Sequence, residues 1–73
     1  AGAEVGGMEI RVNGEQHDLP QAMSVVELLK HLGLRGDRVA IERNMEILPR
    51  REWEATRVAA GDSFEIVQLV GGG

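Results

Sequence analysis

The chain has no cysteine, and only two of its 73 residues are aromatic, Trp53 and Phe64. Without thiols it has no Cys nucleophile, no thiolate metal site and no disulfide framework of the kind that stabilises small secreted domains. Two aromatic side chains are too few to form a platform on which nucleic-acid bases stack. The net charge of −4 argues against phosphate-backbone binding, which needs clustered Lys and Arg, so we expect no nucleic-acid partner.

Long apolar runs are absent as well. No segment approaches the roughly 20 apolar residues that cross a bilayer, and no basic segment precedes an apolar run as in a signal peptide. We therefore expect a cytoplasmic protein with no membrane contact. A chain of 73 residues makes one small domain with little room for a deep catalytic pocket. A carrier or a binding module is favoured over an enzyme.

The first third of the chain predicts a β-hairpin. Residues 1–7, AGAEVGG, are small and Gly-rich, and we interpret them as a leader left from cloning or as a flexible arm. Residues 8–12 alternate between apolar and charged side chains, which predicts a half-buried strand. Asn13-Gly14 is the strongest short hairpin signal, and residues 15–19 are expected to return as the second strand.

A short helix is predicted next, over residues 25–32. Ser24 is followed three residues later by Glu27, the spacing of a capping box. Apolar residues recur at helical spacing after it, and Gly33 suits the left-handed position that ends a helix. Isolated helices below about 12–15 residues are marginal in water, so this one is expected to pack on a sheet.

The second half predicts further strands separated by turns. The strands are expected at residues 39–42, 46–48 and 63–70, with a helical turn at 50–55 that packs through Trp53. Arg43-Asn44 is expected to turn the first of these strands into the second, and residues 60–62 to form the turn before the last.

This element order predicts an α+β domain, in which a mixed sheet carries one main helix on one face. The first and last strands are expected to pair in parallel in the centre. That arrangement is the β-grasp, or ubiquitin-like, fold. We assign it to residues 8–70, followed by a flexible glycine tail at residues 71–73.

The glycine tail suggests chemistry at the main-chain terminus. Gly71, Gly72 and Gly73 have no side-chain width, so they can thread a narrow tunnel in a partner enzyme. A carboxylate is a poor electrophile, but its attack on the α-phosphate of MgATP forms an acyl-adenylate from which AMP leaves readily. A sulfur nucleophile can then displace AMP. The partner would supply the metal and the positive charge for this step.

These features resemble the ubiquitin-like sulfur carriers, and among them the ThiS type of thiamine biosynthesis. The resemblance covers residues 8–73 and is strongest in VAIERNMEILPRREWEATRVAAGDSFEIVQLVGGG. Its specific marks are the ERN-E-I stretch, the Gly-Asp turn and the VGGG end, carried by Glu42, Arg43, Asn44, Glu46, Ile47, Gly61, Asp62 and residues 70–73.

The resemblance implies a carrier protein that is a substrate of enzymes and has no cofactor of its own. An E1-like adenylyltransferase of the ThiF type would adenylate the Gly73 carboxylate with MgATP. Sulfur would convert it to a thiocarboxylate, and a thiazole synthase of the ThiG type would take up that sulfur. Gly73 is then the modified residue, Gly71 and Gly72 give the tail access, and Val70 anchors it.

Strand alternation adds a candidate docking patch. Phe64 and Ile66 are expected in the core, which leaves Val67 and Leu69, together with Val70, as apolar surface beside the tail. Scattered surface hydrophobicity is the ordinary alternative, but we interpret these residues as a docking patch for the partner enzymes.

Other functions stay open at this point. The small subunit of molybdopterin synthase shares the fold and the tail, a ubiquitin-like modifier would pass Gly73 to a lysine amine, and a passive β-grasp module would not use the tail. His17 and His31 have no further ligands at metal-binding spacing, so we expect no metal site. Arg50 and Arg51 are interpreted as solvated charges.

Overall fold

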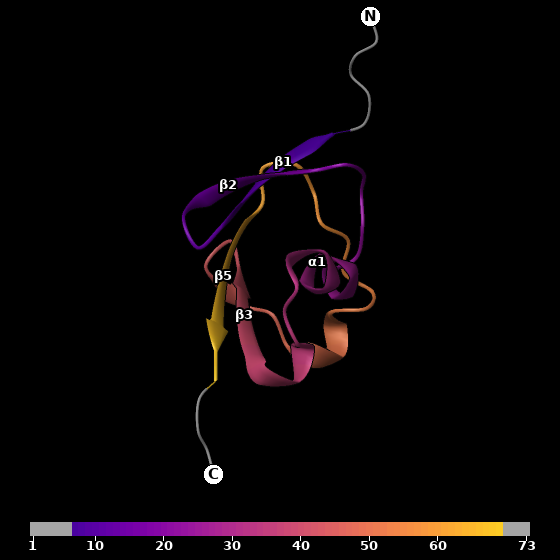
Figure 1. Ribbon diagram of the computed structural model, residues 1–73. Helices are drawn as coiled ribbons and strands as arrows, with labels where there is room; N and C mark the ends of the chain where they lie inside the picture. The colour runs from indigo at the N-terminus through magenta and orange to yellow at the C-terminus, as the bar shows by residue number, and fades with distance from the viewer. Residues whose placement is uncertain (1–6, 70–73) are drawn as a thin grey trace, which may run out of the picture.

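The computed structural model describes residues 7–69, which form one mixed sheet with a single α-helix on one face (Figure 1). The strand order is β2-β1-β5-β3-β4. The elements in chain order are β1 (Met8–Val12), β2 (Glu15–Leu19), α1 (Val25–Leu32), the 3₁₀ turn η1 (Gly36–Arg38), β3 (Val39–Arg43), β4 (Glu46–Ile47), the 3₁₀ turn η2 (Arg50–Glu52) and β5 (Ser63–Gln68). The predicted α+β class and the helix-on-sheet arrangement are confirmed.

The hairpin of β1 and β2 forms as the sequence predicts. Asn13 and Gly14 have φ of 53° and 83°, the left-handed values that a tight hairpin turn requires at both central residues. The strands pair antiparallel from Val12 opposite Glu15 at the turn. The other edge of β1 pairs in parallel with β5, as expected, with Val12 opposite Phe64.

Helix α1 has both of its predicted end signals. The Ser24 side chain accepts a hydrogen bond from the Glu27 N–H at 3.1 Å, and the Glu27 carboxylate accepts one from the Ser24 N–H at 2.9 Å. Gly33 closes the helix at φ 77°. The start of the helix is also tied to a distant segment, because the Val25 N–H donates to the Thr56 carbonyl at 3.0 Å.

The core lies between α1 and the sheet face that this helix covers. Phe64 of β5 is fully buried at its centre, and burying a side chain of this kind contributes about 2–3 kcal/mol to folding. Trp53 is buried as expected, and its indole N–H donates to the Leu48 carbonyl at 2.9 Å. The remaining buried apolar residues are Ile10, Val12, Leu19, Met23, Val25, Leu28, Leu29, Val39, Ile41, Val58 and Ile66.

Several predicted boundaries shift by one or two residues. Strand β3 continues through Arg43, so the turn uses Asn44 and Met45, with φ of 51° and 73°, instead of Arg43-Asn44. Strand β4 ends at Ile47 instead of residue 48. The helical turn predicted over residues 50–55 is a 3₁₀ turn of three residues. The two strand ends depend on strand pairing, which local patterns do not show.

The ends of the predicted domain lie at the limits of the described residues. Strand β1 begins at Met8, as the alternation predicts. Strand β5 ends at Gln68, two residues before the predicted end. Residues 1–6 of the predicted arm, and 70–73 with the predicted tail, lie outside the described residues. Within residues 7–69, no helix is long and apolar enough to cross a membrane.

Candidate functional site

The candidate site begins where the central strand β5 leaves the sheet. The Leu69 N–H donates to the Arg38 carbonyl at 2.7 Å, which continues the pairing of β5 with β3 one residue past the strand. The last described residue is therefore held at the sheet. The predicted modified residue Gly73, the predicted access residues Gly71 and Gly72, and Val70 of the docking patch lie outside the described residues.

The two described members of the docking patch are exposed, as the strand alternation predicts. Val67 is 57% exposed and Leu69 is 51% exposed. The opposite face of β5 is directed toward the core, where Phe64 and Ile66 are buried. The alternation of burial holds through Ile66, and beyond it Val67, Gln68 and Leu69 are all exposed. Exposed apolar side chains therefore lie at the end of the described chain.

Sequence reasoning missed the neighbours of this patch on the adjoining strands. Ala40 of β3 lies directly opposite Val67 and is exposed. Ile47 of β4 is 78% exposed and lies opposite Glu42 on the same sheet face. Alternation within residues 39–43 could have indicated the outward position of Ala40. The place of Ile47 requires the pairing register of β3 with β4.

Asp62 has a structural role that the sequence analysis also missed. It is one of two buried polar residues among those described, at 6% exposure. Its carboxylate accepts hydrogen bonds from Arg43 Nε at 3.0 Å, Asn44 Nδ2 at 3.2 Å and the Ala59 N–H at 2.9 Å. The Gly-Asp turn and the ERN stretch are therefore in direct contact, and together they fix the start of β5.

A second side chain fixes the middle of β5. The side-chain amide of Asn13 accepts a hydrogen bond from the Ile66 N–H at 2.7 Å and donates one to the Ile66 carbonyl at 3.1 Å. The amide therefore pairs with β5 as a neighbouring strand would. Through this contact the hairpin turn helps to hold the strand that leads to the tail.

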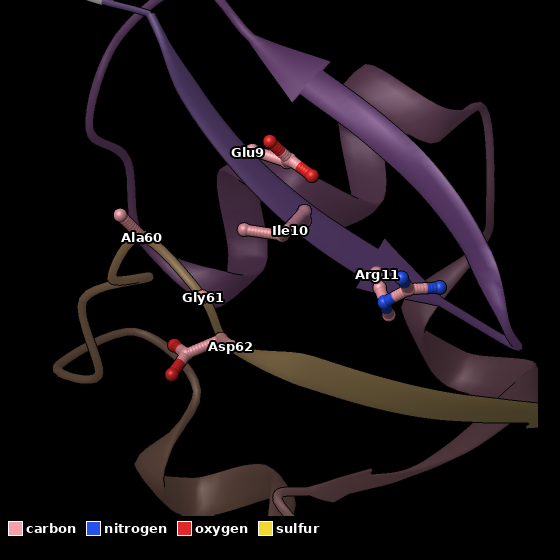
Figure 2. Close-up of a pocket in the computed structure, with 6 residues that line it drawn as sticks. All are labelled: Glu9, Ile10, Arg11, Ala60, Gly61 and Asp62. Atoms are coloured by element: carbon pink, nitrogen blue, oxygen red, sulfur yellow. The ribbon is translucent and has the colours of Figure 1, made fainter.

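One hollow lies at the start of β5. It has a volume of about 490 Å³ and is lined by Glu9, Ile10, Arg11, Ala60, Gly61 and Asp62. Figure 2 shows Glu9 and Arg11 on β1 and the Asp62 carboxylate directed toward the adjoining loop. That carboxylate is already bound by three internal donors. Asp62 therefore has a structural role in this hollow, which is separated from Leu69, the last described residue, by the length of β5.

Another hollow lies beside Leu69, the last described residue. Its volume is about 390 Å³, and Leu69 lines it together with Arg35 and Arg38. Arg35 is paired with Asp37 at 3.2 Å. This hydrogen bond is the main reason that the pKa of Asp37 lies below its ordinary value of 3.8. The hollow therefore has a basic rim that Asp37 neutralises in part.

The other candidates from the sequence do not form a site. Within residues 7–69, no group of three or more His, Cys, Asp or Glu side chains is placed to hold a metal ion. His17 lies on β2 and His31 in the last turn of α1. Arg50 is placed over the Trp53 ring, 5.3 Å from its centroid, so this cation packs on the protein and is not simply solvated.

The fold and this surface define the class of the protein. A five-stranded mixed sheet that holds one helix, with parallel first and last strands at its centre, is the β-grasp fold. Its last strand is followed by exposed apolar residues, and the sequence continues into three glycines. The sequence model described as the ThiS family matches residues 9–73. The chain belongs to the ThiS family.

Individual relatives agree with this assignment. A thiazole synthase from Paramagnetospirillum magneticum is 41% identical over 66 residues, which cover 90% of this chain and 20% of that protein. The chain thus spans about a fifth of that relative. The sulfur carrier protein ThiS of Escherichia coli is 32% identical over 66 residues, covering 90% of this chain and 100% of that protein.

A solved structure agrees as well. The crystal structure of the thiamine biosynthesis protein ThiS from Geobacter metallireducens superposes with a TM-score of 0.79 at 35% sequence identity. The match covers 90% of this chain and 100% of that one. The predicted β-grasp fold and the predicted resemblance to the ThiS type are therefore confirmed.

Proposed function

We propose that this protein is a sulfur carrier for the biosynthesis of the thiazole part of thiamine. The observation that carries the proposal is the family match over residues 9–73. It is supported by similarity to the whole length of a protein named sulfur carrier protein ThiS. The protein is then a substrate and partner of enzymes and does not itself catalyse a reaction.

The reacting group in this proposal is the carboxylate of Gly73. One carboxylate oxygen attacks the α-phosphate of MgATP and pyrophosphate leaves, which produces an acyl-adenylate. A sulfide-level sulfur nucleophile then attacks the carbonyl carbon, AMP leaves, and a thiocarboxylate results. Gly71 and Gly72 give the carboxylate access to an enclosed site because they add no side-chain width.

The enzyme that performs the adenylation would be an E1-like protein of the ThiF type. It would bind the MgATP and supply the positive charge that the reaction needs, so the carrier needs no bound cofactor. Val67 and Leu69 support a docking role because both are about half exposed at the end of the described chain. Val70 extends this patch in the proposal.

The acceptor of the sulfur would be a thiazole synthase. Two proteins named thiazole synthase, from Paramagnetospirillum magneticum and Magnetococcus marinus, each contain a segment similar to 90% of this chain. A carrier-like segment and a synthase within one polypeptide support a direct partnership between the two. In the present protein, the same patch and tail would then serve both the activating enzyme and the synthase.

The test is the intact mass of the protein after incubation with its ThiF-type enzyme, MgATP, cysteine, a cysteine desulfurase and a thiol reductant that releases the persulfide sulfur of the desulfurase as sulfide. We expect a mass gain equal to the replacement of one oxygen by sulfur, which is absent when Gly73 is deleted. Addition of thiazole synthase and its substrates should reverse the gain. No gain, in a mixture that charges a known carrier, would refute the proposal, and lysine-linked adducts would indicate a protein modifier instead.

A further inference from the structure

The turn of the first hairpin contains a pair of residues that can react with each other. Asn13 is followed by Gly14, and this is the one Asn-Gly pair in the sequence. The main-chain nitrogen of a glycine can attack the side-chain amide carbon of the asparagine before it, because glycine has no side chain to hinder the approach. A bond forms between that nitrogen and Asn13 Cγ, and the bond from Cγ to Nδ2 breaks. Nδ2 leaves as ammonia with the proton of the glycine N–H, and a five-membered succinimide ring results.

Water then opens this ring at one of its two carbonyl carbons. Attack at the side-chain carbonyl leaves an aspartate at position 13. Attack at the main-chain carbonyl leaves an isoaspartate, in which the main chain runs through the former side chain and gains one carbon atom. Both products differ from the starting protein by the replacement of NH₂ with OH, and the reaction consumes only water.

The backbone conformation of Asn13 opposes ring closure in the folded protein. The ring contains the Cα–C bond of Asn13, so Cβ and the Gly14 nitrogen must lie on the same side of that bond. Asn13 has φ of 53°, in the left-handed region, where ψ is about +47°. Such a ψ places Cβ and the Gly14 nitrogen on opposite sides of the bond. The hairpin turn therefore has to unwind before the ring can close.

Hydrogen bonds to β5 hold Asn13 in this unreactive arrangement. Its main-chain N–H donates to the Phe64 carbonyl at 2.8 Å. Its side-chain amide accepts from the Ile66 N–H at 2.7 Å and donates to the Ile66 carbonyl at 3.1 Å. Rotation of the side chain toward Gly14 breaks both bonds to Ile66. The pairing with β5 and the turn conformation thus oppose the same reaction.

Asn44 offers a natural comparison within the same chain. It has a similar φ of 51°, and its side-chain amide also holds the start of β5, because it accepts from the Ser63 N–H at 2.9 Å and donates to the Asp62 carboxylate at 3.2 Å. Its successor is Met45, whose side chain hinders attack by its own main-chain nitrogen. The two asparagines are therefore held alike, but only Asn13 is followed by glycine.

We propose that Asn13-Gly14 is a site of spontaneous succinimide formation and that its pairing with β5 controls the reaction. The folded protein resists the reaction, which proceeds in molecules in which β5 has separated from the hairpin turn. Local openings of this kind occur in native proteins without complete unfolding. Asn13 is exposed, so water reaches the ring once it has formed. The reaction involves neither the tail nor a partner enzyme and is independent of the proposed function.

The modification prevents the original pairing from forming again. An aspartate at position 13 has no side-chain N–H to donate to the Ile66 carbonyl, and two oxygen acceptors that face each other without a proton repel. An isoaspartate lengthens the turn by one main-chain atom and so disturbs the register that begins with Val12 opposite Glu15. A transient opening of β5 is thereby converted into a lasting loss of its contact with the hairpin.

The test compares the rate of the reaction in the folded protein with that in the same protein unfolded in guanidinium chloride, at one mildly alkaline pH. Trypsin separates the two asparagines into peptides of residues 12–30 and 44–50. Mass spectrometry records the replacement of NH₂ with OH in each peptide, and chromatography separates aspartate from isoaspartate. A zero-time sample corrects for reaction during digestion. A synthetic peptide of residues 12–30, in both solutions, corrects for direct effects of the denaturant.

We expect Asn13 to react at least about tenfold more slowly in the folded protein than in the unfolded one, because only opened molecules react. Asn44 should react slowly in both. Asp62→Ala, which keeps Asn13 and Gly14 but removes bonds that fix the start of β5, should speed the reaction in buffer. Asp18→Ala is its control and should not. Equal rates at Asn13 in the folded and unfolded protein would overturn the inference, as would an unchanged rate in a destabilised Asp62→Ala.

Asn13→Asp tests the consequence of the modification directly, since it reproduces one of the two products. We expect the Ile66 amide to exchange its hydrogen about tenfold faster in this variant, because its contact with the side chain at position 13 is weakened. Circular dichroism checks that the variant is folded under the conditions of the exchange experiment. An Ile66 amide that exchanges as slowly as in the unmodified protein would show that the modification does not release β5, and would overturn that part of the inference.

Discussion

Arg43 Nε donates to Asp62 Oδ2 across 3.0 Å, and this bond joins the end of β3 to the turn that starts β5. The two residues are 19 positions apart in the chain. The Arg43 side chain is 31% exposed, whereas that of Asp62 is 8% exposed. The carboxylate is therefore largely shielded from water. Its burial would cost free energy without the hydrogen-bond donors around it.

Replacement of Asp62 should destabilise the fold. Asp62→Ala removes three hydrogen bonds and leaves the Ala59 N–H without its acceptor, so we expect a loss of about 2–3 kcal/mol in the free energy of unfolding. Urea denaturation monitored by Trp53 fluorescence measures the change. Asp18→Ala, at an exposed carboxylate on β2, is the control and should change stability little. Equal stability of the two variants would contradict this account.

The side chain of Asn13 can be tested apart from its backbone conformation. Asn13→Gly keeps the left-handed turn but loses both side-chain bonds to Ile66. We expect a loss of about 1–2 kcal/mol and faster hydrogen exchange at the Ile66 amide. Gln16→Ala, which removes only a long exposed contact at 3.4 Å, provides the comparison. An unchanged exchange rate at Ile66 would show that the amide does not support β5.

The docking role of Leu69 predicts a loss of binding without a loss of folding. Leu69→Glu places a charge on a side chain that is 51% exposed, so thermal unfolding should change little. Its affinity for the ThiF-type enzyme should fall by about tenfold or more, because a carboxylate would have to be desolvated in the interface. Gln68→Glu adds the same charge at the adjacent position and should retain binding. Calorimetry that finds both variants equally competent would exclude Leu69 from the interface.

The capping box predicts a specific acid sensitivity. The hydrogen bond from the Ser24 N–H to Glu27 is the main cause that lowers the pKa of Glu27 below its ordinary value of 4.5. A lowered pKa in the folded state means that this stabilisation is present above about pH 4.5. It is lost as the pH falls through the folded pKa.

Ser24→Ala tests this contribution. It removes the side-chain acceptor of the Glu27 N–H, which should lower stability at pH 7 by about 1 kcal/mol. Because the backbone N–H at position 24, the main cause of the lowered Glu27 pKa, is kept in this variant, that pKa should rise only slightly, as followed by NMR titration. Asp37, whose pKa is lowered by a separate partner, Arg35, should titrate as before. A full return of the Glu27 pKa to its ordinary value in Ser24→Ala would argue that the backbone N–H is not the main cause of the shift.

Local patterns in the sequence determined the elements and their inner faces. Alternation over residues 8–12, the turn at Asn13-Gly14 and the caps at Ser24 and Gly33 all act within a few residues of chain. Such signals depend on backbone dihedrals and hydrogen bonds between neighbouring residues, so they can be recognised in the sequence without knowledge of the fold. The outward positions of Val67 and Leu69 followed from the same period of two.

Contacts between distant segments were decided only by the tertiary structure. The pairing of Glu42 with Glu65, the place of Ile47 beside them and the bonds of Asp62 to the ERN stretch all depend on strand register. Register is a collective result of core packing, in which a shift of one residue would turn each inner side chain to the other face. The sequence alone thus predicted an apolar patch beside the tail, whereas the fold arranged the charges around it.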